Sequence, residues 1–330
     1  MAGKKKLPDL ADLDRMLGLD IVRVTEAAAI AAARLRGRGD EQAADQAALA
    51  AMHAALAGLP FPGKVVVGEG DKGEAAHLFV GETIGHGKGM VFDIAADPLE
   101  GTTICAKNLP NSLSVIAVAG PDGLLHTPNI YMEKIAVGPG YPAGVVDLDA
   151  PARVNIAAVA KAKGVPAEEV TVCILDRPRH MRLIAEVRET GASIRLIGDG
   201  DVAGVIHTSD PEETGIDIYM GSGAAPAGVL AAAALRCTGG QMFGRLMVQN
   251  EDHLRLVKAA GIADPARIYA VEEMAKGEVL FAATGVTDGN FLSGVRFRGD
   301  RVRTHSILMS SATGTIRSIR SSHPDAAKGC

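Results

Sequence analysis

The sequence predicts a layered α/β protein with two lobes, and three observations support this class. Apolar residues recur at helical spacing from about residue 9 to 36 and again from 41 to about 58. Short β-prone runs separated by Gly and Pro turns follow up to about residue 150, which favours a largely antiparallel sheet. Beyond that point strand and helix patterns alternate, which is typical of a layered lobe with partly parallel strands. We therefore expect one part over 1–150 and a second over 151–330.

Each expected element has a local cause. The first helical pattern is broken by Gly37 and Gly39, and Asp40 stands where a carboxylate would cap the next helix. A strand over 64–67 follows a Pro-Phe-Pro-Gly turn. The further strands expected in the first part are 77–80, 90–96, 113–119, 124–126 and 145–148. In the second part we expect strands 171–176, 193–197, 216–220, 302–310 and 314–319, and helices 180–190, 202–208 and 226–236.

Composition limits the classes of function. The net charge of −5 gives no electrostatic reason to bind nucleic acid, and seven Phe, four Tyr and no Trp leave little for base stacking. Four widely spaced cysteines without a Cys-x-x-Cys pair predict reduced thiols in a cytoplasmic protein. The basic start, Lys4-Lys5-Lys6, leads into no apolar signal core, and no run reaches 18 apolar residues. We expect neither secretion nor a membrane span.

The chemistry is expected around the end of the apolar run 90–96. Asp97 ends this run, Pro98 should turn the chain there, and Glu100 is close enough for both carboxylates to converge. The next three residues offer free backbone N–H groups and hydroxyls: Gly101, Thr102 and Thr103. Hard oxygen ligands beside anion donors suit Mg²⁺ or Mn²⁺ with a phosphate substrate. The alternative is an ordinary strand-to-helix turn with solvated acids.

Other motifs lie at the ends of expected strands, and each has a plain alternative. Glu69 between two glycines is either a metal ligand or a solvated turn acid. Arg177 and Arg179, on either side of Pro178, match phosphate geometry or form a surface pair. The carboxylates of Asp199-Gly200-Asp201 either accept sugar hydroxyls or make a turn and helix cap.

These motifs carry a family resemblance. Asp97-Pro-Leu-Glu-Gly-Thr102 resembles the Asp-Pro-(Ile/Leu)-(Asp/Glu)-Gly-Thr signature of the metal-dependent, lithium-sensitive sugar and inositol phosphatases. With Glu100 and the other motifs, the chain resembles class II fructose-1,6-bisphosphatase from about residue 15 to about 318. The resemblance implies two lobes of sheets sandwiched by helices, with the active site between them. It also implies a homodimer or homotetramer.

The resemblance further implies a reaction and a set of site residues. The reaction would be hydrolysis of the 1-phosphate of fructose 1,6-bisphosphate in gluconeogenesis, with sedoheptulose 1,7-bisphosphate as a second substrate. Mn²⁺ or Mg²⁺ would be held by Asp40, Glu69, Asp97 and Glu100, and Thr102 would orient water or the leaving oxygen. The two arginines would hold the phosphate that is not cleaved. The implied substrate contacts are Glu100, Gly101, Thr102, Tyr131, Arg177, Pro178, Arg179, Asp199, Gly200 and Asp201. A tyrosine packed at a sheet edge is the alternative for Tyr131.

The sequence departs from the family pattern at three positions. Gly73 occupies the place of an Asp that helps to position the attacking water. Ala227 replaces a metal-binding Glu, and Ala224 replaces a glycine near the substrate. Two alternatives therefore stay open: a phosphatase acting on another phosphorylated molecule, and a weakly active or inactive paralogue that binds a sugar phosphate.

Overall fold

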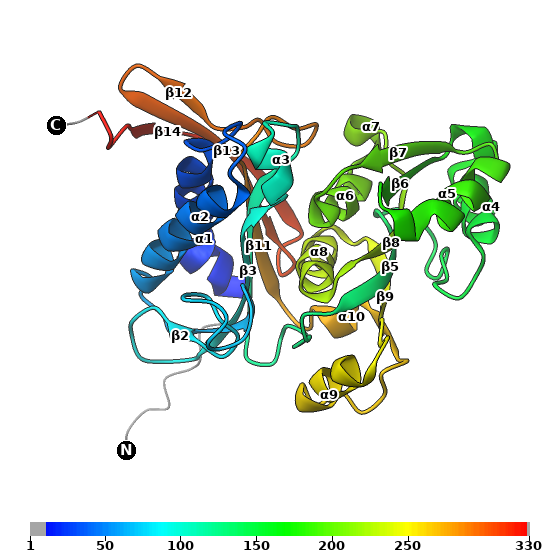
Figure 1. Ribbon diagram of the computed structural model, residues 1–330, viewed down its shortest axis with the longest axis horizontal. Helices are drawn as coiled ribbons and strands as arrows, with labels where there is room; N and C mark the ends of the chain where they lie inside the picture. The colour runs from blue at the N-terminus through cyan, green and yellow to red at the C-terminus, as the bar shows by residue number, and fades with distance from the viewer. Residues whose placement is uncertain (1–10, 329–330) are drawn as a thin grey trace.

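A computed structural model describes residues 11–328 of the chain. Helices and sheets alternate across the molecule in five layers, as Figure 1 shows. A helix pair covers the outer face of a first sheet, a middle helix layer separates it from a second sheet, and two further helices cover the far side. The fold is thus the layered α/β class that the sequence predicts.

The outer helix pair consists of α1 (Ala11–Ala33) and α2 (Glu41–Ala57). Both helices are close to prediction, although the expected start near residue 9 lies outside the described residues. Gly37 and Gly39 adopt positive φ angles of 72° and 75°, a conformation that ends a helix at little cost for glycine. The side chain of Asp40 then accepts the backbone N–H of Ala43 at 2.9 Å, which caps α2.

The first sheet has eight strands and is largely antiparallel; only β1 and β3 pair in parallel. Its path is β12-β13-β11-β4-β3-β1-β2, and β14 pairs with β13. The strands are β1 (Gly63–Val67), β2 (Thr83–Ile84), β3 (Phe92–Glu100), β4 (Leu113–Ala119), β11 (Val279–Gly285), β12 (Arg296–Arg298), β13 (Arg301–Ser310) and β14 (Thr315–Pro324).

Several expected strands in the first part differ from the structure. The run 77–80 is not a strand, because Leu78 has a φ of 53° that no extended segment can contain. Residues 145–148 are irregular, with a bend at Val145 and a turn at Leu148, and 124–126 contributes a single bridge from Leu124 to Ala275. The strand expected to stop at Asp97 instead continues as β3 to Glu100, with a shift of register between these two residues.

The second sheet has six strands in the order β10-β9-β5-β8-β6-β7. β6 pairs in parallel with β7 and β8, and the other pairs are antiparallel. The strands are β5 (Tyr131–Val137), β6 (Thr171–Leu175), β7 (Ser193–Ile197), β8 (Ile218–Ala224), β9 (Gln241–Leu246) and β10 (Ile268–Ala270). The expected boundary at residue 150 falls between β5 and α4 (Ala152–Lys163), both of which belong to this half, whereas β11 to β14 return to the first sheet.

The middle layer is built around α8 (Ala225–Thr238), an Ala-rich helix buried on nearly all sides. One apolar cluster joins α8 and α6 (Asp201–Ile206) to the first sheet, and another joins α8 to the second. Small side chains let both sheets approach this helix closely. The remaining helices are α3 (Thr102–Ala106), α5 (Met181–Glu189), α7 (Pro211–Thr214), α9 (Glu251–Ala259) and α10 (Val271–Met274). Within residues 11–328, no helix has both the length and the apolar character needed to cross a membrane.

Candidate active site

A cavity of about 320 Å³ opens between the first sheet and the middle helices. Its walls come from α2, from the ends of β1 and β3, from the turn before α6 and from the start of α8. The residues that line it are Asp45, Val67, Gly68, Glu69, Ala96, Asp97, Leu99, Glu100, Gly101, Thr102, Asn129, Asp199, Asp201, Ala224, Pro226, Ala227 and Leu230. Segments far apart in the chain therefore meet in one polar hollow between the two sheets.

Four carboxylates on the first-sheet side dominate this cavity. Asp45 comes from α2, Glu69 from the end of β1, and Asp97 and Glu100 from β3. In a regular strand, residues three apart would point to opposite faces. The shift of register at Pro98, which has no N–H for the ladder, lets Asp97 and Glu100 face the same cavity.

The carboxylates are crowded and withdrawn from water, which favours their protonated forms. Burial, together with the charges of Asp97 and Asp45, raises the pKa of Glu69 to about 8. Burial and the charge of Asp45 raise the pKa of Asp97 to about 7. The pKa of Glu100 is raised well above its ordinary value, by burial first and by the charge of Asp97 second. A bound cation would remove this repulsion.

Glu100 shows most directly that the site suits a cation. Its Oε1 accepts the backbone N–H of Val202 at 3.0 Å, while its Oε2 is buried and has no hydrogen-bond partner among the described residues. A Cβ at Gly200 would lie 3.1 Å from this free oxygen. An unpaired buried carboxylate oxygen is costly unless something positive meets it. Four carboxylates without nitrogen or sulfur donors are a hard oxygen set of the kind that Mg²⁺ and Mn²⁺ prefer.

The two expected arginines lie beside the cavity rather than in its wall. Arg177 Nη2 is 3.7 Å from Asp199 Oδ1, which links it to the cavity lining. Arg179 donates to the backbone oxygen of Ser222 at 2.7 Å, and its guanidinium lies 4.7 Å from the ring centroid of Tyr131. The structure thus brings together Tyr131 and Arg179, which are 48 positions apart in the numbering. Pro178 begins a short 3₁₀ turn (Pro178–His180) that directly follows Arg177 and contains Arg179.

A buried ion pair supports the second-sheet side of the cavity. Lys134 on β5 is only 2% exposed, pairs with Asp201, and donates to the backbone oxygen of Ala224 at 3.2 Å. A Cβ at Gly223 would lie 2.0 Å from the Asp201 carboxylate, so glycine is required for this approach. Sequence reasoning did not single out Lys134. A lysine at an inward position of a buried strand was the available signal.

Comparison with known proteins identifies the family. Residues 15–323 match the family described as bacterial fructose-1,6-bisphosphatase, glpX-encoded. Proteins named D-fructose 1,6-bisphosphatase class 2/sedoheptulose 1,7-bisphosphatase are similar to this chain. The one from Synechococcus sp. (strain JA-3-3Ab) is 42% identical over 94% of this chain and 96% of its own length. That from Synechococcus elongatus (strain ATCC 33912 / PCC 7942 / FACHB-805) is 38% identical over 94% and 97%. The chain belongs to the class II fructose-1,6-bisphosphatase family.

One acid in the cavity of this class II family member escaped sequence reasoning. Asp40, expected as a metal ligand, is exposed and caps α2, and it does not line the cavity. Asp45 lines it instead, half-buried one turn further along the same helix, and burial raises its pKa. The available signal was an acid interrupting the Ala-rich stretch 43–48, next to the buried stripe of Ala44 and Ala48.

The departures from the class II pattern also have definite places. Ala227 and Ala224 both line the cavity, so the missing Glu at 227 is missing from the site itself. Gly73 is exposed, has a φ of 102°, and is not part of the cavity lining. Asp71 and Glu74, the acids on either side of position 73, are exposed, and the backbone N–H of Asp71 donates to the Glu74 carboxylate at 3.2 Å. Neither lines the cavity.

Proposed function

We propose that this protein is a divalent-metal-dependent phosphatase that hydrolyses the 1-phosphate of fructose 1,6-bisphosphate, with sedoheptulose 1,7-bisphosphate as a second substrate. The observation that carries this proposal is the set of four carboxylates that meet in one cavity, with a free buried oxygen on Glu100. The names of the relatives supply the substrates.

The proposed metal ligands are Asp45, Glu69, Asp97 and Glu100, with Asp45 in the place expected for Asp40. When bound, Mg²⁺ or Mn²⁺ would activate a water and neutralise charge on the transferring phosphoryl group. Glu100 is already oriented by the N–H of Val202, so its second oxygen is presented without a further change of side-chain conformation. Thr102, at the cavity wall just after Gly101, would orient the water or the leaving oxygen.

The proposed substrate contacts lie on the second-sheet side. Arg177 and Arg179 would hold the uncleaved phosphate, because guanidinium groups match phosphate oxygens in pairs. Ser222 and the ring of Tyr131 hold Arg179 in place before any substrate arrives. Asp199 would accept sugar hydroxyls at the cavity wall, and the Lys134 partner fixes the position of Asp201.

A second candidate function is sugar-phosphate binding with little or no hydrolysis. It is favoured by Ala227, which leaves the cavity one carboxylate short of the family pattern, and by Gly73, where no nearby acid reaches the site. The binding groups on the second-sheet side are intact in both functions. The two functions therefore differ in turnover and agree in ligand binding.

One experiment separates these functions. Phosphate release from a panel of phosphorylated sugars would be measured with Mg²⁺ and with Mn²⁺, alongside calorimetric binding of each sugar. Metal-dependent release from fructose 1,6-bisphosphate at the position-1 phosphate supports the main proposal. Release only from other compounds points to another phosphatase substrate, and binding without release points to the non-catalytic paralogue.

We also propose a homodimer or homotetramer that works in the cytoplasm. The assembly follows from the family resemblance and would be tested by analytical ultracentrifugation. The compartment is supported by the thiols of Cys105, Cys173 and Cys237, which are buried and free in the described part of the chain.

A further inference from the structure

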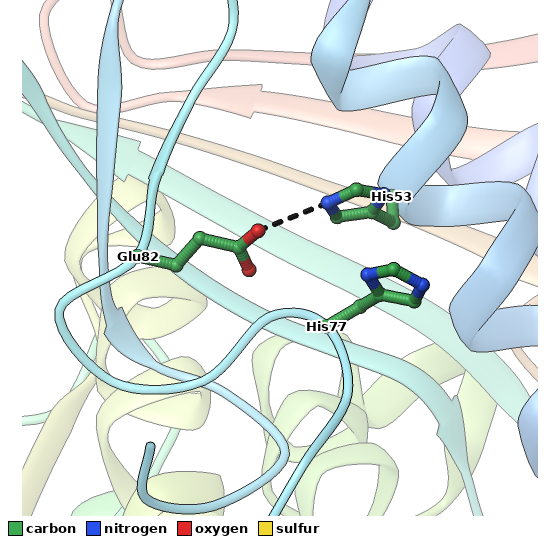
Figure 2. A group of neighbouring side chains, drawn as sticks. All are labelled: His53, His77 and Glu82. Atoms are coloured by element: carbon green, nitrogen blue, oxygen red, sulfur yellow. Dashed lines mark hydrogen bonds and ion pairs between the residues drawn. The ribbon is translucent and has the colours of Figure 1, made fainter. Parts of the chain in front are cut away.

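Two histidines and a glutamate converge outside the carboxylate cavity. His53 lies on α2, while His77 and Glu82 lie on the segment 68–82 that links β1 to β2. Each side chain offers one ligand atom, and these three atoms all lie within 4.8 Å of one another. Figure 2 shows the ring of His53 above that of His77, with the carboxylate of Glu82 facing the ring nitrogen of His53. None of the three residues lines the candidate active site.

The geometry of the group is more specific than a chance contact. Nε2 of His53 and Oε1 of Glu82 are 3.0 Å apart, and the ring centroids of His53 and His77 are 4.0 Å apart at an interplanar angle of 26°. The backbone N–H of Leu78 donates to the other carboxylate oxygen of Glu82, which fixes the carboxylate in the orientation it shows. The side chains of His53 and Glu82 are 25% and 15% exposed, so the group is sheltered but reachable from solvent.

A hydrogen bond between His53 and Glu82 would by itself account for only two of the three residues. His77 adds a second imidazole whose ring nitrogen is within reach of the same point. Two imidazole nitrogens and one carboxylate oxygen are a ligand set of Zn²⁺, with a fourth position left for water. In a tetrahedral site with bonds of about 2.0–2.1 Å the ligand atoms are about 3.4 Å apart, so the stacked rings of His53 and His77 would rotate for their nitrogens to converge on an ion.

We propose that His53, His77 and Glu82 form a second cation site, selective for Zn²⁺, that is separate from the oxygen-only cavity. The two sites differ in donor type: imidazole suits Zn²⁺, whereas carboxylates suit Mg²⁺ and Mn²⁺.

The position of this site gives the ion a mechanical role. The backbone oxygen of Leu78 accepts the N–H of Glu69 at 3.0 Å, and the N–H of Leu78 donates to Glu82. One residue thus connects the zinc site to a carboxylate of the candidate active site. His53 is on the same helix as Asp45, so the ion would link the segment 68–82 to α2 and fix the position of Asp45 relative to Glu69.

The test is metal binding, which does not depend on turnover. The full-length protein is titrated with Zn²⁺, and in parallel with Co²⁺ as a visible-absorption probe, in excess Mg²⁺ to fill the oxygen cavity. We expect one equivalent of Zn²⁺ to bind and Co²⁺ to give the intense absorption of a tetrahedral site with nitrogen ligands. His53→Gln and His77→Gln should each weaken this binding by more than about tenfold. His86→Gln is the matched control, because the side chain of His86 is hydrogen-bonded to the backbone oxygen of Gly58 and lies outside the group.

Two results would overturn the zinc site. In the first, wild-type protein binds no Zn²⁺ in the presence of excess Mg²⁺. In the second, His53→Gln and His77→Gln bind Zn²⁺ as tightly as His86→Gln does. If a variant does not fold, X-ray absorption of wild-type protein with one equivalent of Zn²⁺ decides, because the proposal requires scattering from two imidazole rings. Amide hydrogen exchange over residues 68–82 should also slow when Zn²⁺ is added. All three readouts hold whether or not the protein hydrolyses a sugar bisphosphate.

Discussion

Glu100 on β3 and Val202 on α6 are joined by a hydrogen bond of 3.0 Å that crosses from the first sheet to the middle helix layer. The bond uses one carboxylate oxygen and leaves the other buried, with no hydrogen-bond partner within residues 11–328. A residue that served only to join the layers would not need the second oxygen to face a cavity lined by five more carboxylates. The pairing of Glu100 with Val202 is better understood as the way a metal ligand is held in place.

The first prediction concerns this ligand directly. Glu100→Gln keeps an oxygen to accept the N–H of Val202 but removes the negative charge, so the fold should survive and metal-dependent turnover should be abolished. Asp97→Asn should act in the same way. Phosphate release at saturating Mn²⁺, with circular dichroism as the folding check, measures both effects. Near-wild-type turnover in either variant would show that the site is assigned to the wrong residues.

The second prediction separates two acids of one helix. Asp45→Asn should raise the Mg²⁺ or Mn²⁺ concentration needed for half-maximal activity by at least about tenfold, which corresponds to about 1.4 kcal/mol. Asp40→Asn is the matched control, because asparagine caps helices as well as aspartate does and Asp40 lies outside the cavity. The opposite pattern, with Asp40→Asn inactive and Asp45→Asn normal, would restore the assignment expected from the motif alone.

The third prediction concerns pH and metal removal. Burial raises the pKa of Glu69 from 4.5 to about 8 in the folded, metal-free protein. Between these two pH values Glu69 is protonated in the folded state and ionised in the unfolded chain. Because the native state then binds more protons than the unfolded state, the free energy of unfolding should fall as pH rises from about 4.5 through 8. Cations bind the ionised form, so the stabilisation by Mg²⁺ should grow over the same window.

Thermal melting in EDTA and in saturating Mg²⁺ at several pH values tests this relation. Other groups also titrate in this range, so the informative quantity is the melting temperature of Glu69→Gln minus that of wild type. In EDTA this difference should increase with pH, since the variant has no charge to bury. A difference that stays constant from pH 5 to pH 8 would mean that Glu69 is not held in a repulsive site.

The fourth prediction concerns the arginines. Arg177→Ala and Arg179→Ala should each weaken binding of the bisphosphate by about ten- to a hundredfold, the usual cost of losing a charged hydrogen-bond partner. Binding of the corresponding monophosphate without the distal phosphate should change little. Arg182→Ala is the control, because the Arg182 side chain is 92% exposed one turn away. Equal losses for both ligands would indicate a structural effect instead.

Sequence reasoning predicted the elements of this fold well where the hydrophobic periodicity and the Gly or Pro residues that end a segment agree. The strand 113–119 coincides with β4, and the first helix ends at Ala33, close to the expected end near residue 36. Its failures share a cause, which is that tertiary contacts override local preference. The β-prone run 77–80 is bent at Leu78, which is buried and hydrogen-bonded to Glu82. No local pattern says that the chain returns to its first sheet at β11.

Some residues of the candidate site are marked by local sequence motifs, whereas others are brought there only by tertiary packing. Glu69, Asp97 and Glu100, which the motifs single out, all line the cavity, and each stands at a strand end next to Gly or Pro. Asp45 lies inside a helix with no such marker, and only the packing of α2 on the first sheet turns it inward. Arg179 and Tyr131 meet for a similar reason, since their contact depends on how β5 and β8 pair.

The last prediction is that turnover is limited by the two departures from the family pattern. Ala227 lines the cavity without a carboxylate, and Gly73 leaves the segment 68–82 without an acid in the place from which the family positions water. Each 1.36 kcal/mol lost from transition-state stabilisation reduces the rate by a factor of about ten, so wild-type activity should be low. Ala227→Glu should restore the missing ligand and lower the Mn²⁺ requirement.

Gly73→Asp is a harder substitution, and the structure says why. A Cβ at this position meets no atom of the described residues within 4 Å, so there is room for the side chain, but the φ of 102° strains any residue with a Cβ. We therefore expect a small gain from Gly73→Asp alone and a larger one in combination with Ala227→Glu, once an added ligand orders the metal and its water. Bisphosphatase activity of the two single variants and the double variant across Mn²⁺ concentrations measures this. No gain in any of the three, or a wild-type enzyme already turning over at an ordinary phosphatase rate, would show that these two positions do not limit the reaction.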